Sequence, residues 1–225
     1  MKYSNNYDII KSRGVNMKKS LSYLVKSILA GIMIGIGGTI FLSLDNKVLG
    51  ACLFAIGLFM IVINGYNLYT GKVGYIFDNK PKYLIEVFIT IIGNFIGTFI
   101  VGFILKYTRV YSTLHERALS LCNIKLEDSI LSILLLSAMC GMLMYLAVNG
   151  YKVMKDNFAK YASVFLCVIV FILCSFEHSI ANMYYFSVAG WNLKSFEYLL
   201  IMILGNAIGG VFIPLMTKLK NYLEK

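Results

Sequence analysis

The sequence contains few charged residues. Asp, Glu, Lys and Arg together make up only 14% of the 225 residues, whereas hydrophobic residues make up 59%. A soluble domain averages about 25% charged residues, so this chain has too little charge to cover a surface that faces water. The composition therefore indicates a protein whose solvent is the lipid bilayer.

Two further absences narrow the class of protein. Residues 1–19 are polar, with no short apolar core and no small-residue cleavage site, so they do not resemble a secretory signal. The five cysteines include no CxxC pair and four lie in apolar runs, so disulfides are not expected. Cys167, Cys174 and His178 would share one helical face, but small apolar residues near a histidine explain that spacing equally well. We expect no metal and no cofactor.

Long apolar segments predict six membrane-spanning helices. A spanning helix needs about 20 mostly apolar residues. Such segments occupy roughly 20–44, 48–77, 82–108, 127–150, 159–190 and 196–217. The second and fifth segments are too long for one simple crossing, and each contains a polar interruption, NGYNLYTGK at 64–72 and SFEHSIANM at 175–183. The sequence therefore predicts an all-α membrane protein whose second and fifth helices are broken.

The two halves of the chain resemble each other. GNFIGTF at 93–99 in the third span matches GNAIGGVF at 205–212 in the sixth, and each follows a broken helix. GNxxG places small residues on one helix face, where neighbouring backbones can approach closely. This order predicts two inverted repeats, about 20–108 and 127–217, whose broken helices meet near the middle of the membrane. The predicted helix-packing residues are Gly93, Asn94, Gly97, Gly205, Asn206 and Gly209.

Positive charge predicts the orientation of the chain. With the N-terminus inside, most of the 21 Lys and Arg residues lie on the inner side, and the segment between the third and fourth spans is an outer loop. We therefore expect both termini in the cytoplasm of a multi-pass protein of the cell inner (plasma) membrane. Residues 1–19 would form an N-terminal segment, 20–217 the six-helix domain and 218–225 a C-terminal tail. The net charge of +10 follows from this topology and does not indicate nucleic-acid binding.

The broken helices place polar groups at membrane depth. Irregular backbone there is stable only within protein or beside a water-filled cavity, so both interruptions are expected to line a pathway. Glu177 and His178 are ionisable residues deep in a span, which makes them a functional hypothesis, with a packing pair as the alternative. His178 can donate, accept or carry a proton, and the Thr70 hydroxyl adds a donor suited to an anion. We expect Glu177 to orient His178 by accepting a hydrogen bond from a ring nitrogen or a backbone N–H.

These motifs resemble those of the formate–nitrite transporter family. FEHSIANMYY at 176–185 is similar to the family signature FEHSxANM, and LYTGK at 68–72 to its other interrupted-helix motif, ELFTG. AGIMIGIGG at 30–38 and both GNxxG motifs also fit, so the resemblance covers about residues 20–217. It implies an aquaporin-like fold, assembled as a homopentamer, that passes small monovalent anions such as formate, nitrite and hydrosulfide, and in some members acetate or lactate.

The resemblance assigns roles by motif position. His178 resembles the central histidine, Thr70 its partner across the pathway, and Lys125 a vestibule lysine that attracts anions. The predicted pathway residues are His178, Thr70, Glu177, Asn182 and Lys125. The predicted apolar constriction consists of Leu58, Leu68, Tyr69, Phe171 and Met144.

Three positions depart from the family pattern. Asn67 stands where ELFTG has its glutamate, and in CGMLMYLAVN at 140–149 Gly141 and Asn149 stand where the fourth helix of the family has asparagine and tryptophan. These departures leave the choice among anions open.

The sequence predicts a channel or facilitator for a small weak-acid anion, and the resemblance implies formate first, with hydrosulfide or nitrite as further candidates. One alternative is a neutral small-solute channel on the same fold. The other is a membrane enzyme that uses Glu177 and His178 as acid and base. The chain has two histidines and no HExxH motif, which argues against an enzyme.

Overall fold

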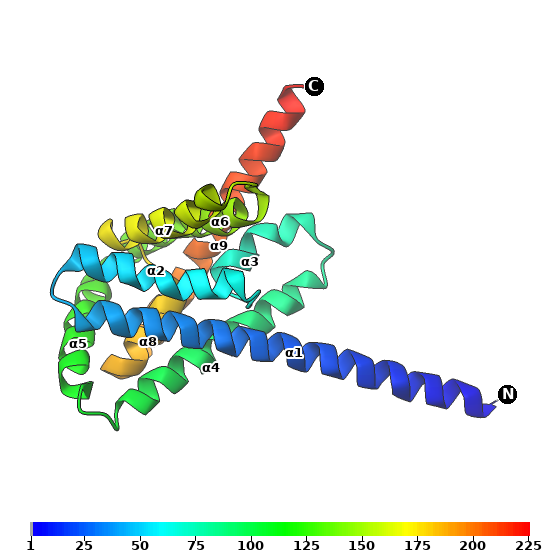
Figure 1. Cartoon of the computed structure of the whole chain (residues 1–225), viewed down its shortest axis with the longest axis horizontal. Coiled ribbons are helices and arrows are strands. Elements are labelled where there is room, and N and C mark those ends of the chain that lie inside the picture. The colour runs from blue at the N-terminus through cyan, green and yellow to red at the C-terminus, as the bar shows by residue number, and fades with distance from the viewer. Residues whose placement is uncertain (1) are drawn as a thin grey trace.

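The computed structural model describes the backbone of residues 2–225 and the side chains of residues 18–225. Most of the predicted N-terminal segment, residues 1–19, lies outside the residues whose side chains are described. The part of the chain that is described is helical (Figure 1). Its elements are α1 (Lys2–Ser43), α2 (Lys47–Ile63), α3 (Tyr69–Lys72), the 3₁₀ helix η1 (Val73–Asp78), α4 (Tyr83–Leu105), α5 (Tyr111–Glu127), α6 (Ile130–Val153), α7 (Asn157–Leu173), α8 (Ser179–Ala189) and α9 (Leu193–Leu223).

The helices fall into long and interrupted ones. Within the described residues, α4, α6, α9 and the Lys18–Ser43 part of α1 are long and apolar enough to cross a membrane. The apolar helices α2 and α7 are shorter, and each ends at one of the predicted interruptions. In the first half α1 packs on α4 and α2, and in the second half α6 packs on α9 and α7. Contacts between α2 and α7 join the two halves.

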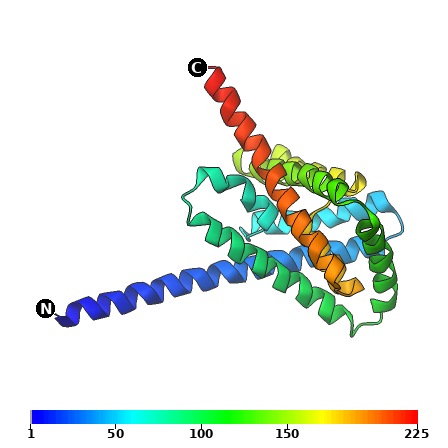
Figure 2. The same ribbon diagram turned by 180° about the vertical axis from the view of Figure 1, so that it is seen from behind.

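The bundle has two ends with different contents. Both termini project away from α5, in diverging directions, with the α3 and η1 segment between them (Figures 1 and 2). We call the end with this segment the terminal face. The other end carries α5, α8 and the turn between α1 and α2, and we call it the α5 face. The segment after the first interruption, which consists of α3 and η1, runs toward the terminal face. The segment after the second interruption, α8, runs toward the α5 face.

Both interruptions begin with the same type of helix ending. After α2, Gly65 has φ +64°, and after α7, Ser175 has φ +55°. Tyr66 and Phe176 each donate a backbone hydrogen bond of 2.9 Å to the carbonyl five residues earlier. A left-handed residue followed by such a bond terminates a helix and satisfies its last carbonyls. Glycine adopts this conformation without strain, whereas Ser175 is one of the uncommon non-glycine residues that do so.

Asn94 of α4 holds the first interruption in place. Its side-chain oxygen accepts the Tyr69 N–H at 2.9 Å, and its amide nitrogen donates to the carbonyls of Ser27 at 2.7 Å and Asn67 at 2.8 Å. These bonds satisfy backbone groups that the interrupted helix leaves unpaired, which burial in a membrane interior requires. We call this arrangement the Asn94 frame.

Asn206 of α9 holds the second interruption in the same way. Its side-chain oxygen accepts the Ser179 N–H, and its amide nitrogen donates to the carbonyls of Ser137 and Glu177, each at 2.8 Å. The three partners of Asn206 follow the three partners of Asn94 by the same number of residues. This Asn206 frame and the Asn94 frame are therefore two copies of one hydrogen-bond pattern.

Glycines next to the two asparagines allow the helices to approach closely. A Cβ atom on Gly97 would collide with the carbonyl oxygen of Ile28, and one on Gly209 would collide with the carbonyl oxygen of Ala138. The α1–α4 and α6–α9 pairs therefore touch through their backbones. This proximity brings each asparagine within hydrogen-bonding distance of the neighbouring helix.

The connection between α4 and α6 differs from the prediction. We expected an outer loop, but residues 111–127 form the helix α5, with Leu114, Ala118 and Cys122 buried on one side. Burial raises the pKa of the Cys122 thiol to about 12, so it is a neutral packing group. The helix packs on α8. At the other end of the chain, α9 runs to Leu223 and not to 217, where the predicted span ends.

Candidate functional site

The His178 ring lies where the two interruptions meet. His178 is the N-cap residue of α8, and its Nδ1 atom accepts the Ala181 N–H at 3.0 Å. An accepting Nδ1 carries no proton, so in a neutral ring the proton is on Nε2. Nε2 lies 2.9 Å from the Thr70 hydroxyl oxygen and therefore donates to it. The helix cap thus fixes both the orientation and the tautomer of the ring.

Thr70 reaches this ring from the other interruption. It follows the N-cap of α3, and its side chain is fully buried. Because its oxygen accepts from His178, its hydroxyl proton is available to a ligand. The pair therefore presents one hydrogen-bond donor at the centre of the bundle.

Glu177 pairs with a lysine from α5. Its two carboxylate oxygens lie 2.7 and 2.6 Å from the Lys125 ammonium, and one of them accepts from the Asn182 side chain at 2.8 Å. The Lys125 and Glu177 side chains are 11% and 5% exposed. The expectation that Glu177 orients the His178 ring by accepting from a ring nitrogen or a backbone N–H is wrong, because both ring nitrogens have other partners and the carboxylate accepts from the Lys125 and Asn182 side chains. Glu177 positions Lys125 and Asn182 instead.

A small cavity opens from this group toward the α5 face. Its volume is about 80 Å³, and His178, Lys125 and Asn182 contribute to its wall. Lys47 also lines it and donates to the Ser175 hydroxyl at 3.3 Å. Three of the predicted pathway residues therefore share one cavity.

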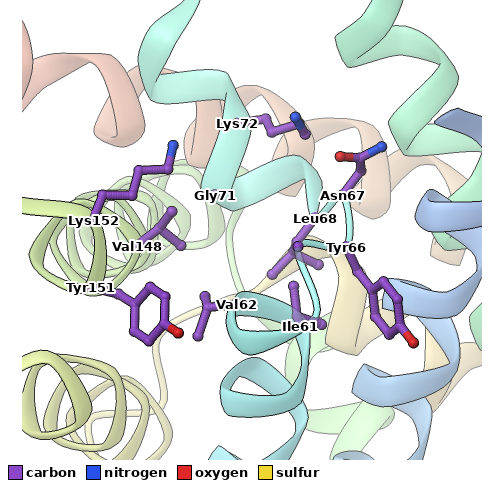
Figure 3. A pocket seen from close by; sticks show the side chains of 11 residues that line it. Ile61, Val62, Tyr66, Asn67, Leu68, Gly71, Lys72, Val148, Tyr151 and Lys152 are labelled. Carbon is purple, nitrogen blue, oxygen red and sulfur yellow. The ribbon is translucent and has the colours of Figure 1, made fainter. Parts of the chain in front are cut away.

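A larger cavity lies on the terminal side, with a volume of about 270 Å³ (Figure 3). Sequence reasoning did not identify this cavity or its two lysines, because they come from α3 and α6. The lining residues are Ile61, Val62, Gly65, Tyr66, Asn67, Leu68, Gly71, Lys72, Val148, Tyr151 and Lys152. Leu68 and Gly71 are on either side of the Tyr69–Thr70 pair in the sequence. The cavity toward the α5 face thus reaches His178, and the terminal cavity reaches Leu68 and Gly71 next to that pair.

The predicted constriction residues are distributed over the core. Leu68 lines the terminal cavity and Phe171 the cavity on the α5 face, where its ring stacks on His178 with 5.5 Å between centroids. Leu58 and Met144 are buried in the core. The Tyr69 hydroxyl donates to a backbone carbonyl of α9 at 2.8 Å, so its polar end is directed toward that helix.

The three departures from the family pattern have structural explanations. The Asn67 side chain donates to the Tyr23 carbonyl at 3.1 Å, and the Asn149 side chain accepts from the Tyr75 hydroxyl at 3.2 Å. A Cβ atom on Gly141 would collide with the carbonyl oxygen of Asn206, so this glycine permits close packing of α6 on α9. Asn67 and Asn149 thus both lie on the terminal side.

The cysteines near His178 do not extend the site. Within residues 18–225, no three His, Cys, Asp or Glu side chains gather as metal ligands do. Cys174 is exposed and Cys167 partly buried, both as free thiols.

Comparison with known proteins agrees with the sequence motifs. The model of the formate/nitrite transporter family matches residues 10–219. The chain is 27% identical to the formate-nitrite transporter of Plasmodium falciparum, over 86% of this chain and 75% of that protein. It is also 27% identical to the nitrite transporter NirC of Salmonella typhimurium, over 85% of this chain and 80% of that protein.

Solved structures show the same fold. A pentameric formate channel with formate bound matches 92% of this chain and 98% of its own, with a TM-score of 0.74 and 24% identity. An ion channel of the same family matches 88% and 89%, with a TM-score of 0.76 and 24% identity. Interrupted helices, paired asparagine frames and a family match over nearly the whole chain lead to one conclusion, that this protein belongs to the formate/nitrite transporter family.

Proposed function

We propose that the chain is a channel or facilitator for small monovalent anions of weak acids, with formate as the first candidate and hydrosulfide or nitrite as further ones. The observation that carries this proposal is the 2.9 Å contact between Thr70 and His178, with one cavity that reaches His178 and another that reaches Leu68 and Gly71. An anion that leaves water for an apolar passage needs hydrogen-bond donors or a proton. The Thr70 hydroxyl supplies a donor there.

The geometry defines how His178 takes part. In this conformation the ring is a neutral donor to Thr70, and its other nitrogen caps α8. A proton on Nδ1 would face the Ala181 N–H, so the charged ring requires this cap to open. A mechanism that moves a proton through His178 therefore includes a rearrangement at the start of α8.

The assembly and orientation belong to the same proposal. The chain functions as a homopentamer in the plasma membrane, with two inverted three-helix repeats and the terminal face toward the cytoplasm. Large apolar side chains on α4 and α9 support it, because Phe88, Phe103 and Leu200 are exposed on a single chain. Lipid or neighbouring copies would cover them. Mass measurement in mild detergent tests the assembly, and a stable monomer as the sole species would contradict it.

Flux measurements test the proposed function. Purified protein in liposomes should take up formate rapidly and unchanged, in competition with nitrite, hydrosulfide and lactate between pH 5 and 8. His178→Phe should abolish this flux because an apolar ring removes the hydrogen bond to Thr70. His178→Asn should retain flux with an altered pH dependence and selectivity.

His115→Asn is the matched control. His115 is on α5, where its ring contacts the Val188 carbonyl at 2.9 Å, so this variant should keep the wild-type pH profile. Wild-type flux in the His178→Phe variant would make the histidine a packing residue. Uptake of uncharged solutes without anion uptake would favour a neutral-solute channel, and chemical conversion of the solute would indicate an enzyme.

A further inference from the structure

The terminal cavity has two lysines at its wall without a carboxylate partner. Lys72 from α3 and Lys152 from α6 both line it, and neither forms an ion pair with any side chain among residues 18–225. Figure 3 shows both ammonium groups on the same side of the cavity, with the apolar side chains of Ile61 and Val62 on the opposite side. The cavity therefore combines a cationic rim with an apolar floor.

Aromatic rings hold both ammonium groups. The Lys152 ammonium lies 3.9 Å from the centroid of the Tyr75 ring, and the Lys72 ammonium lies 5.0 Å from that of Tyr23. Such contacts restrain a cation without neutralising its charge. Tyr75 is itself fixed by its hydrogen bond to Asn149. One of the departures from the family pattern therefore supports the position of Lys152.

The surrounding charges favour an anion between these lysines. The charged side chains around Lys72 are the cations Lys152 and Lys26 and the carboxylate of Glu86 on α4. Glu86 is not an ion-pair partner of Lys72. Among residues 18–225, no carboxylate lies within ion-pair distance of the Lys72 ammonium. At the equivalent position of the other interruption Glu177 supplies a carboxylate, but here Asn67 supplies a neutral amide. An incoming anion would offset the repulsion between Lys72 and Lys152, which no carboxylate within ion-pair distance offsets among residues 18–225.

We propose that Lys72 and Lys152 form an anion-binding station at the terminal mouth, which captures the transported anion before it reaches Thr70 and His178. The identity of that anion as a small monovalent one rests on the proposed function. The station itself rests on the two lysines, their aromatic supports and the cavity of about 270 Å³ that they line.

The first experiment measures the salt dependence of formate flux in neutral phosphatidylcholine liposomes. At about 0.01 M salt, where charges act over about 30 Å, the double variant Lys72→Gln/Lys152→Gln should lose on the order of tenfold in rate. At about 1 M salt, where the range is about 3 Å, the loss should fall below about twofold. The variant Lys72→Arg/Lys152→Arg keeps both charges and should restore the rate and its salt dependence.

Lys155→Gln/Lys160→Gln is the matched control. Both lysines lie at the same end of the bundle, between α6 and the first turn of α7, and neither lines the cavity. This variant removes the same number of charges and should change flux by less than about twofold at either salt concentration. An equal loss in both double variants would show a general surface-charge effect and overturn the proposal.

The second experiment detects anion binding without transport. In the His178→Phe variant, formate should slow acylation of the Lys72 and Lys152 amines, measured by mass spectrometry against gluconate at equal ionic strength. Acylation of Lys155 should not change. Equal rates in formate and gluconate would overturn the station, and so would protection that requires anionic lipid instead of formate.

The two experiments separate the station from the proposed function. If the wild-type protein carried no anion but formate still protected both amines, the proposed function would fail and the station would stand. If the wild-type protein carried formate but the amines were unprotected and the lysine variants transported normally, the station would fail and the proposed function would stand.

Discussion

At the second interruption Glu177 forms an ion pair with Lys125, whereas at the first interruption the equivalent residue, Asn67, donates to a backbone carbonyl. The backbone around both residues is the same, because one carbonyl hydrogen bond to Asn94 or Asn206 fixes each of them. The two interruptions therefore share their scaffold and differ in charge.

The lysines follow the same division. On the α5 face the charge of Lys125 is balanced by a carboxylate, and Lys47 donates to a hydroxyl and a carbonyl. On the terminal face, Lys72 and Lys152 rest on aromatic rings. Lys125 thus has a carboxylate partner that neutralises its charge, whereas Lys47, Lys72 and Lys152 form no ion pair among residues 18–225. The comparison teaches that one hydrogen-bond frame can support either arrangement, depending on a single side chain.

The largest expected effect comes from breaking the ion pair. Glu177→Leu leaves the Lys125 charge buried and unpaired, which should lower the free energy of unfolding by about 3–5 kcal/mol. Thermal unfolding in detergent measures this loss. Lys125→Gln/Glu177→Gln removes both charges and should recover most of it. Equal stability of Glu177→Leu and Asn67→Leu would contradict the division between a charged and an uncharged interruption.

The next effect tests whether the two frames are equivalent. Asn94→Ala and Asn206→Ala each remove three hydrogen bonds and leave one N–H and one carbonyl of the interruption without these partners, whereas the carbonyls of Ser27 and Ser137 keep their bonds within α1 and α6. Each variant should lower the free energy of unfolding by about 3 kcal/mol. A buried unsatisfied group costs about 1–3 kcal/mol, and relaxation of the surrounding structure recovers part of that cost. Thermal unfolding of both variants measures the costs. A loss confined to one of them would show that the frames are unequal.

A smaller effect is expected at the left-handed residues. Gly65→Ala should lower the free energy of unfolding by about 1–2 kcal/mol, because a side chain is unfavourable at φ +64°. Ser175→Gly removes a side chain from a left-handed residue and should raise the free energy of unfolding by up to about 1 kcal/mol. The loss of the hydrogen bond from Lys47 to the Ser175 hydroxyl would reduce this gain. Thermal unfolding in detergent measures both changes, with Asn64→Ala and Cys174→Ala as controls at the neighbouring positions. Stabilisation by Gly65→Ala would contradict the described helix ending.

The smallest expected effect is the influence of salt on the flux lost in Lys125→Gln. Lys125→Gln should reduce flux by a factor that changes less than about twofold between about 0.01 and 1 M salt, because buried charges are screened little. Flux in liposomes, measured beside the Lys72→Gln/Lys152→Gln variant, tests this difference. A strong salt dependence of the Lys125→Gln effect would instead support the anion-attracting role that the resemblance implies for Lys125.

The sequence predicted the features that depend on local pattern. The polar segments at 64–72 and 175–183 mark both interruptions, since a long apolar run with internal polar residues cannot remain one straight span. The FEHSIANMYY motif predicted His178 as a pathway residue, and LYTGK predicted Thr70. The structure brings these two residues into contact, and the family match supports the motifs from which they were chosen.

Features that depend on packing between distant helices could not be predicted in this way. Lys125 and Glu177 are 52 residues apart, and their pairing depends on how α5 packs against α8. The helix α5 itself was missed because its segment is short and polar, although Leu114, Ala118 and Cys122 recur every four residues. Lys72 and Lys152 belong to different halves, so their shared cavity becomes visible only in the folded chain.

The two asparagine frames also bear on how the protein is made. Ser27, Asn67, Tyr69 and Asn94 all precede residue 95, so the first frame needs nothing from the second half of the chain. It can close while the ribosome is still synthesising α6 to α9, and the second frame closes later from its own half. The order of synthesis thus delivers two self-contained pieces to the membrane, and their docking assembles the centre of the pathway.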